Sequence, residues 1–412
     1  MKFDINRHIM LFDVAVAGHH ANYIRHLTKY WCERDLQGSL YIVVSPTFIH
    51  QHSDVLDIPL LYRQKNVFFI SISRKEEKLF SANKSRLERL MRAFQEWQLM
   101  CKYANSLTAT HCLIMYFDIL KLPLAFRAKP PCPVSGIYFQ PKFYYRDFKT
   151  YLPSQKELIQ QQIDKFILSC VLQNPELNKL FCLDPFAIDK INKCNSNVKA
   201  IHLPDPVFMI NQHEIDSAKQ KEILGIQADR QVFMLFGSLT RRKGIQKLLE
   251  AVTMLPQDLG QKLCLVLLGV PEPIEEKPLI ASWLEKIYHL QSSLQIITKY
   301  EYIPETDVHK YFHMADVILI PYQRQAGMSG ILLLAASTCK PVLSTNYGLI
   351  GALVQQYNLG LTVDTSVAGE IAKGLTAFLS KAPSSFCDIS QMQSFVQNHT
   401  PEKFASIIFE NI

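Results

Sequence analysis

The sequence lacks the patterns that mark several common classes of protein. Its ten cysteines form no Cys-x-x-Cys pair and no Cys/His cluster at zinc-ligand spacing, so we expect buried, reduced thiols and no metal site. No run of 18 apolar residues is present, which excludes a membrane-spanning helix. The apolar run at 9–18 is short and contains Asp13, so it predicts a buried strand and not a signal peptide. We therefore expect a cytoplasmic protein.

Carboxylates are absent from one long stretch of the second half. No Asp or Glu lies between Asp316 and Asp364. Within this stretch a short loop leads into an apolar block, and it consists of Gly327, Met328, Ser329 and Gly330. Glycines let backbone amides approach an anion closely, and Ser329 adds a hydroxyl. The loop predicts a phosphate-binding turn, with a structural turn before a core helix as the alternative.

The composition is that of a globular protein with an uneven charge. The chain has 412 residues, of which 48% are hydrophobic and 20% charged, and this predicts at least two domains. Residues 1–205 hold 27 Lys and Arg against 18 Asp and Glu, whereas residues 206–412 hold 17 against 19. The basic first half predicts an anionic partner, such as an acidic acceptor or a membrane surface. We expect no nucleic acid, because no recognised nucleic-acid-binding module accompanies the charge.

Apolar runs alternate with helical patterns along the whole chain. The runs predict strands at 9–17, 39–45, 67–72, 112–117, 133–139, 231–237, 263–269, 294–300, 316–322 and 341–345. Continuously apolar runs are typical of parallel strands that helices cover on both faces. Helical spacing predicts helices at 19–31, 87–97 and 244–255. The sequence therefore predicts an α/β protein with two Rossmann-like, doubly wound parallel-sheet domains, which join near 202–209 and bind ligands in an interdomain cleft.

The loop after the expected strand at 231–237 is rich in cations. Gly237 and Ser238 begin it, and Arg241, Arg242 and Lys243 follow just before a helix. Cations oppose the dipole at a helix start, so they have little structural use there, but together with the helix amides they form an anion site. A solvated basic turn is the alternative. These side chains can neutralise a diphosphate, so no metal ion is needed.

Three further loops provide candidate site residues. Gly18 precedes the first expected helix, and His19 and His20 open it. We expect one of the two histidines to hydrogen-bond a phosphate of the acceptor or donor, with a surface histidine as the alternative. We expect Asp118 to orient an acceptor hydroxyl or to act as a base, with helix capping as the alternative. Tyr300 and Tyr302 predict stacking on a nucleobase, with core aromatics as the alternative.

Several segments of the second half resemble the nucleotide-binding domain of GT-B glycosyltransferases, and more narrowly that of the retaining glycosyltransferase family 4. These segments are FGSLTRRKGIQKLLEAV, LVLLG, YIPETDVHKYFHMADVILIPY and GMSGILLLAASTCKPVLSTNYGLIGALV. GHHANYI resembles the glycine loop of the family's first domain, and the last residues resemble its final helix, which crosses back onto that domain. The resemblance implies an acceptor-binding domain at 1–205, a donor-binding domain at 206–397 and a crossing helix at 398–412.

The chain departs from the family at one of its two basic positions. Lys243 matches the family's lysine, whereas Ser238 stands where the family has an arginine. Arg241 or Arg242 replaces that charge. The resemblance implies that a main task of this site is to stabilise the leaving diphosphate. The cations needed for that task are still present.

Both glutamates of the family's E-x7-E motif are also absent. Ala326 and Leu334 occupy their positions. The resemblance implies that these glutamates contact the donor sugar and the ribose. Backbone carbonyls, Ser329, Asn346 or Tyr347 would have to accept those hydrogen bonds in this chain.

The resemblance implies a glycosyltransferase that moves a sugar from a nucleoside-diphosphate sugar, with UDP or GDP as the expected nucleotide, to an acceptor hydroxyl with retention. The acceptor is a glycan, a lipid or a small molecule, and no cofactor is expected. A non-catalytic nucleotide-sugar-binding subunit and a nucleotide-sugar epimerase are the alternatives. The expected catalytic residues are Arg242, Lys243, Asp118 and His19; the expected donor-binding residues are Gly18, Gly237, Ser238, Arg241, Gly327, Met328, Ser329 and Gly330, with Tyr300 and Tyr302 at the nucleobase.

Two basic segments of the first half also contain apolar or aromatic residues. Residues 74–102 hold eight Lys and Arg against four Glu, and residues 141–151 interleave aromatic residues with cations. This pattern predicts association with the anionic inner face of a membrane. An ordinary amphipathic helix with a solvated outer face is the alternative.

Overall fold

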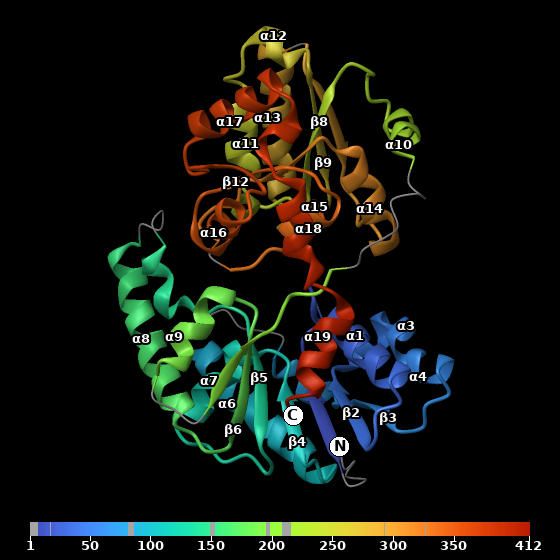
Figure 1. Ribbon diagram of the computed structural model, residues 1–412, viewed down its shortest axis with the longest axis vertical. Helices are drawn as coiled ribbons and strands as arrows, with labels where there is room; N and C mark the ends of the chain where they lie inside the picture. The colour runs from blue at the N-terminus through green and yellow to red at the C-terminus, as the bar shows by residue number, and fades with distance from the viewer. Residues whose placement is uncertain are drawn as a thin grey trace. The chain divides into compact units, whose positions relative to one another are not determined.

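The chain forms two compact units. The computed structural model describes residues 7–16, 18–80, 86–148, 153–194, 198–207, 216–291, 293–325 and 327–412 (Figure 1). Unit 1 comprises Met1–Tyr144, Pro153–Pro206 and Pro401–Ile412. Unit 2 comprises Tyr145–Leu152 and Val207–Thr400.

Unit 1 is built on a seven-stranded sheet. Its strands are β1 (His8–Phe12), β2 (Ser39–Val44), β3 (Val67–Ser71), β4 (His111–Ile114), β5 (Val134–Tyr138), β6 (Leu177–Cys182) and β7 (Lys199–His202). Their spatial order is β3-β2-β1-β4-β5-β6-β7, and every neighbouring pair is parallel. The direction of winding reverses between β1 and β4, and doubly wound sheets bind ligands beyond the carboxyl ends of the strands at such a point.

Unit 2 repeats this plan with six strands. They are β8 (Gln231–Phe236), β9 (Leu263–Leu268), β10 (Gln295–Lys299), β11 (Val317–Ile320), β12 (Val342–Thr345) and β13 (Gly360–Val363). Their order is β10-β9-β8-β11-β12-β13, again parallel throughout. Here the winding reverses between β8 and β11. The prediction of two doubly wound parallel-sheet domains is confirmed.

Helices flank both sheets (Figure 1). Those of unit 1 are α1 (His20–Glu33), α2 (Pro46–Gln51), α3 (Ser53–Leu56), α4 (Ile58–Leu61), α5 (Arg74–Lys78), α6 (Arg86–Ser106), α7 (Phe117–Ala125), α8 (Gln155–Leu172), α9 (Ile188–Asn192) and α19 (Pro401–Phe409). Those of unit 2 are α10 (Ser217–Ile223), α11 (Ile245–Val252), α12 (Gln257–Gly260), α13 (Glu276–Leu290), α14 (Glu305–Met314), α15 (Gly330–Ser337), α16 (Gly348–Gln356), α17 (Ala368–Ser380) and α18 (Ile389–Gln397).

Helices on both sheet faces explain the unbroken apolar runs. All six residues of β9 are buried, as are all four residues of β11. Because alternate side chains of a strand point to opposite faces, each face of unit 2's central strands needs an apolar cover. Helix α11 provides part of it with Ile245, Leu248 and Leu249, which are fully buried in the same core cluster. Each such buried side chain contributes about 1.5–3 kcal/mol to folding.

The last helix of the chain packs on the first. Phe404 of α19 lies 4.7 Å from the ring of Tyr23, and Phe409 lies edge-on to Trp31 at 5.2 Å. Arg7 donates hydrogen bonds to the carbonyl oxygens of Phe409 and Ile412. The C-terminal residues therefore complete the core of unit 1.

The sequence located ten strands and missed three. The missed strands β6, β7 and β13 contain polar residues or are partly exposed, so they lack a continuous apolar run. Several predicted strands extend beyond the observed ends. Strand β1 ends at Phe12, because the carboxylate of Asp13 accepts a hydrogen bond from the amide of Ala15 and the chain turns. Strand β11 likewise stops at Ile320.

The basic helix predicted near 87–97 exists as α6, but its apolar side chains are divided between core and solvent. Trp97 is buried, whereas Leu90, Met91 and Phe94 are exposed. Lys84 and residues 149–151 of the predicted membrane-contacting segments lie outside the described residues. None of the described helices is both long and apolar enough to cross a bilayer.

Candidate functional site

The predicted anion loops meet at the carboxyl edge of the unit 2 sheet. Strand β8 pairs with β11, so the loops that follow them flank the point where the winding reverses. The backbone N–H of Gln323 donates to the carbonyl of Arg242 at 2.8 Å. The structure therefore brings together two segments that are about 80 residues apart in the chain.

Two glycines give the β8 loop its shape. Gly237 and Gly244 have φ angles of +103° and +80°, a region that favours glycine. A Cβ atom on Gly244 would lie 1.9 Å from the carbonyl oxygen of Pro321, so only glycine allows the two loops to touch. Between the glycines, Thr240 caps a short 3-10 turn by accepting a hydrogen bond from the amide of Lys243 at 3.1 Å. Helix α11 begins after Gly244, with no side-chain cap.

Lys243 is held by a tyrosine from the β11 loop. Its Nζ donates to the hydroxyl of Tyr322 at 2.5 Å and lies 4.1 Å from the centroid of that ring. Tyr322 is 1% exposed. The hydroxyl of Ser329 donates to the same phenol oxygen at 3.4 Å. The phenol thus links the cation to the start of α15, a role for Tyr322 that the sequence did not suggest.

The other two cations of the loop are more exposed. Arg242 hydrogen-bonds the side-chain amide oxygen of Gln325, and Arg241 is exposed. Within the described part of the chain, no carboxylate pairs with Arg241, Arg242 or Lys243. Three adjacent cations repel one another and oppose the dipole of α11, and a bound anion would relieve both effects.

The loop before α15 is compact. Gly327 and Ser329 are buried, Met328 is half-buried, and Ser329 is the N-cap residue without a side-chain cap hydrogen bond. A Cβ atom on Gly330 would meet open space, so the fold does not require glycine there and the helix start is accessible. Ala326, one of the two positions of the missing glutamates, lies outside the described residues.

The second of those positions and Ser238 offer no charge. Leu334 is half-buried within α15, where its carbonyl oxygen accepts hydrogen bonds from the hydroxyls of Ser337 and Thr338. Ser238 is half-buried directly after Gly237. The described residues of this edge therefore present cations and amides, without an acid from 327 to 363.

The two candidate nucleobase residues differ in their surroundings. Tyr300 directly follows β10, packs against the core cluster of unit 2, and burial raises its pKa. Tyr302 is 79% exposed. Strand β10 lies two strands away from β8. Their role at a nucleobase stays a prediction, for which the exposed Tyr302 is the more accessible ring.

In unit 1, Gly18 and His19 lie beyond the carboxyl end of β1. Gly18 is exposed with a φ of +85°. The ring of His19 stacks on Phe139 at 4.5 Å and on His20 at 4.6 Å. Burial, and to a lesser degree the charge of His20, lowers the pKa of His19 to about 3. His19 is therefore neutral at physiological pH, and its buried Nε2 atom has no hydrogen-bond partner among the described residues.

The neighbouring His20, the second of the two histidines that open α1, pairs with a carboxylate. Its Nδ1 lies 2.7 Å from Oδ2 of Asp13. Burial alone would lower the pKa of His20, but the charge of Asp13 and the hydrogen bond to it outweigh burial, and the pKa is raised. The sequence showed two adjacent histidines, but only the direction of each side chain on α1 determines which one meets Asp13.

The carboxylate of Asp118 is hydrogen-bonded to backbone amides. The predicted strand at 112–117 ends at Ile114, so Asp118 lies in the first turn of α7 and not at a strand end. Its carboxylate accepts hydrogen bonds from the amides of Phe139 at 2.8 Å and Gln140 at 3.1 Å. Burial raises its pKa. In this arrangement Asp118 fixes the loop after β5, and a role as a base stays a prediction.

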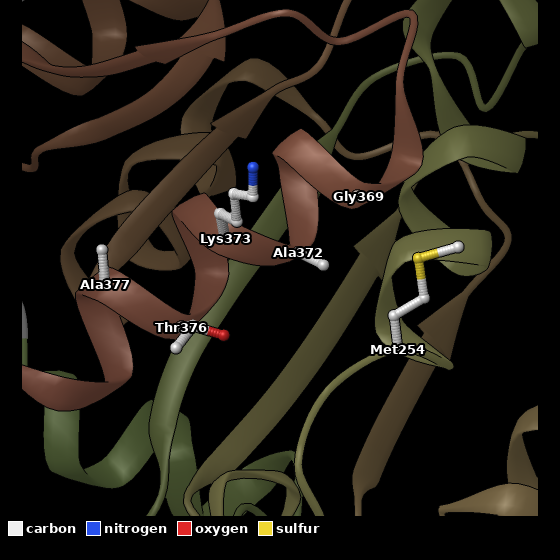
Figure 2. Close-up of a pocket in the computed structure, with 6 residues that line it drawn as sticks. All are labelled: Met254, Gly369, Ala372, Lys373, Thr376 and Ala377. Atoms are coloured by element: carbon white, nitrogen blue, oxygen red, sulfur yellow. The ribbon is translucent and has the colours of Figure 1, made fainter.

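A hollow of about 420 Å³ lies elsewhere on unit 2 (Figure 2). Met254, which follows α11, faces residues of α17 across it. Its lining consists of Met254, Gly369, Ala372, Lys373, Thr376 and Ala377. Met254 lies at the opposite end of α11 from Gly244, so this hollow contains none of the predicted site residues.

Comparisons with known proteins agree with this geometry. Residues 216–391 match the family of glycosyl transferases group 1. No curated protein matches the chain. Sucrose-phosphate synthase from Thermosynechococcus elongatus has a similar structure, with a TM-score of 0.71 at 15% identity over 98% of each chain.

Two further solved structures share the fold. HepE of Anabaena in complex with UDP-glucose has a TM-score of 0.63 at 12% identity over 98% of each chain. WaaG, a glycosyltransferase involved in lipopolysaccharide biosynthesis, has a TM-score of 0.59 at 14% identity over 97% of this chain and 99% of that chain. Residues 216–391 therefore form a domain that matches glycosyl transferases group 1, and the chain has the GT-B fold.

Proposed function

We propose that this protein is a glycosyltransferase that binds a nucleoside-diphosphate sugar at the carboxyl edge of unit 2 and transfers the sugar to an acceptor hydroxyl with retention. The observation that carries the proposal is a group of three cations beside the uncapped starts of α11 and α15, Arg241, Arg242 and Lys243, for which the described residues provide no carboxylate partner. Charge-assisted hydrogen bonds from Arg and Lys to phosphate are strong, and helix amides add to them.

In this proposal the side chains and amides serve the leaving group. The bond between the sugar and the diphosphate breaks, and negative charge develops on the phosphate oxygen. Fixed donors stabilise that charge in the transition state. We assign this role to Lys243, which is held in place by Tyr322 and by the turn that Thr240 caps. Arg241 and Arg242 bind the more distal phosphate oxygens. No metal ion is required for this step.

UDP is the nucleotide we propose first, because HepE, which shares the fold, is described in complex with UDP-glucose. The hydroxyls of the sugar and ribose need acceptors other than the missing glutamates. Carbonyl oxygens of the β11 and β12 loops and the side chain of Asn346 are our candidates, with Tyr302 at the base. We propose that unit 1 binds the acceptor.

A thermal-shift panel of UDP-, GDP-, ADP- and dTDP-glucose tests the donor site. We expect at least one donor to raise the melting temperature of the full chain. Lys243→Ala should weaken binding of that donor roughly tenfold or more, because a hydrogen bond to a charged group contributes about 1.5–3 kcal/mol. Lys247→Ala is the matched control, since Lys247 lies four residues away on α11 and pairs with Glu250. If none of the four donors stabilises the wild type, the donor site is wrong.

A non-catalytic nucleotide-sugar-binding subunit is the second candidate. The observation that favours it is the loss of both glutamates at Ala326 and Leu334, since fold alone does not establish activity. Release of UDP from UDP-glucose separates the two: a transferase releases UDP in the presence of an acceptor, and slowly with water, whereas a binding subunit holds the donor intact.

A further inference from the structure

The cation group of unit 2, which consists of Arg241, Arg242 and Lys243, carries more positive charge than a diphosphate needs. A nucleoside-diphosphate sugar has one negative charge on each of its two phosphates, so one cation of the group has no phosphate charge to match. The uncapped starts of α11 and α15 add partial positive charge at the same edge of the sheet. The donor site is therefore suited to a ligand with a third negative charge.

Acids in the other loops of this edge do not neutralise the cation group. Asp364, which follows β13, accepts hydrogen bonds from a neighbouring serine, and Glu301, which follows β10, pairs with a lysine of that strand at 3.0 Å. Glu272 and Glu275, which follow β9, are exposed and form no ion pair with the group in the described part of the chain. The excess positive charge thus stays available to a ligand.

Arg242 is oriented by a neutral partner from the β11 loop. Its guanidinium donates to the side-chain oxygen of Gln325, and its backbone carbonyl accepts from the amide of Gln323 at 2.8 Å. An amide oxygen can position a guanidinium, but it does not neutralise its charge. Because a guanidinium has several N–H donors in a planar fork, Arg242 keeps donors both for a phosphate oxygen and for a carboxylate.

The contact with Gln325 places Arg242 beside the segment that reads the donor sugar. In the sequence Gln325 directly precedes Ala326, the position at which the resemblance to family 4 implies a contact with that sugar. The hydroxyls of a neutral sugar bind well to acceptors such as glutamate, whereas a carboxylate needs donors. The sequence has no acid at 327–363, and this edge offers instead Arg242 and the amides that open α15, where a Cβ atom on Gly330 would meet open space. Donors have thus replaced acceptors where the sugar is read.

We propose that the donor is a nucleoside-diphosphate uronic acid, whose sugar carries a carboxylate at C6, and that Arg242 binds this carboxylate. The inference rests on the proposed function and adds to it the chemical class of the sugar. The three negative charges of such a donor match the three cations of the group. Hydrogen bonds between arginine and a carboxylate are among the strong ones in proteins. A neutral hexose leaves one cation unmatched and binds more weakly.

Matched pairs of donors test the class of the sugar. UDP-glucose and UDP-glucuronic acid differ only at C6 of the sugar, which carries a hydroxyl in one and belongs to a carboxylate in the other. UDP-galactose with UDP-galacturonic acid and GDP-mannose with GDP-mannuronic acid form two further pairs of this kind. Titration calorimetry at neutral pH measures their affinities for the full chain, together with those of UDP and GDP alone.

We expect the wild type to bind the uronic acid of the best pair at least about tenfold more tightly than its neutral partner, because hydrogen bonds between charged groups contribute more than neutral ones. Arg242→Gln should reduce this preference to about twofold or less. Arg241→Gln is the matched control, since it removes the same charge from the adjacent exposed residue. It should weaken both members of a pair and keep their ratio within about threefold of the wild type, because an exposed charge acts through water and is screened.

The possible outcomes separate the inference from the proposed function. If UDP or GDP binds but no uronic acid binds more tightly than its neutral partner, the inference is overturned and the proposed function stands. A preference that survives in Arg242→Gln, or that is lost equally in Arg241→Gln, overturns the assignment of the carboxylate to Arg242. The wild-type pairs decide the class of the sugar even if a variant does not fold. If no donor and no nucleoside diphosphate binds, the proposed function is refuted, and the inference with it.

Discussion

At the carboxyl edge of the unit 2 sheet the cations Arg241, Arg242 and Lys243 lie exposed or half-buried, with no carboxylate partner among the described residues. At the same edge of unit 1, Asp13 and His20 are buried and paired with each other. An unpaired cation near solvent remains available to an anion. A buried pair, in contrast, polarises one nitrogen and excludes loose ions. The two edges of equivalent sheets therefore differ in the charge that they leave available: unit 2 presents cations, whereas unit 1 holds a carboxylate and a histidine that are paired with each other.

The largest effect should come from breaking the buried pair. Asp13→Ala leaves a buried histidine without its counter-charge, which costs about 3–5 kcal/mol of unfolding free energy. The matched control is Asp54→Ala, whose partner Arg25 forms an exposed ion pair that contributes about 0–1 kcal/mol. Urea denaturation of both variants measures the difference. Equal losses would show that the buried pair is no more important to stability than a surface contact.

The next effect concerns the loop contact in unit 2. Gly244→Ala places a methyl group against the carbonyl of Pro321 and adds strain at a positive φ, so we expect a loss of about 2–3 kcal/mol together with weaker UDP binding. Gly369→Ala is the control, because its Cβ would meet open space in an ordinary conformation. Urea denaturation measures the loss of stability, and UDP titration measures the loss of affinity. A Gly244→Ala variant as stable as the wild type would disprove the contact between Gly244 and Pro321.

A third effect appears on acidification. Burial lowers the pKa of His111 to about 4, below its unfolded value near 6.5. The unfolded chain then binds the proton more readily, so stability from this site is present above pH 6.5 and is lost as pH falls towards 4. His111→Asn should remove about 2–3 kcal/mol of that pH dependence. Parallel stability–pH curves of variant and wild type would contradict the assignment.

A smaller effect isolates the phenol that holds Lys243. Tyr322→Phe keeps the ring under the ammonium and removes the hydroxyl at 2.5 Å. We expect UDP affinity to fall roughly fivefold, because the variant keeps the charge of Lys243 and loses only one hydrogen bond that positions it, and a typical hydrogen bond contributes about 1 kcal/mol. Tyr311→Phe, which removes the corresponding hydroxyl at Lys299, is the matched control. Equal UDP affinities for Tyr322→Phe and the wild type would show that the hydroxyl of Tyr322 does not position Lys243 for binding.

The smallest effect concerns the membrane. Leu90, Met91 and Phe94 are exposed on the basic helix α6, a combination that favours an anionic bilayer. Flotation with vesicles containing an anionic lipid should recover more protein than flotation with neutral vesicles, and Leu90→Gln with Met91→Gln should reduce the recovery a fewfold. Equal recovery from both kinds of vesicle would support the solvated-helix alternative.

The sequence predicted the parallel sheets because their strands are continuous apolar runs, and it predicted the cation loop because three adjacent cations precede a helix. It missed β7 and β13, whose four residues each have partly exposed positions. It also could not find the Lys243–Tyr322 contact, which spans 79 positions and depends on the register of β8 and β11. The choice between His19 and His20 needed the three-dimensional direction of the two rings.

The hydrogen bond from the amide of Val207 to the carbonyl of His399, at 2.8 Å, joins the two places where the chain enters and leaves unit 2. Apart from Tyr145–Leu152, unit 2 is in topological terms an insertion whose ends meet, within a unit 1 that lies at the beginning and the end of the chain. Because unit 2 ends at Thr400, directly before the last segment of unit 1, most of unit 1 is synthesised first but lacks the cover of α19 over Tyr23 and Trp31 until after unit 2 has been made. The unit whose synthesis begins first is therefore the one whose core is closed last.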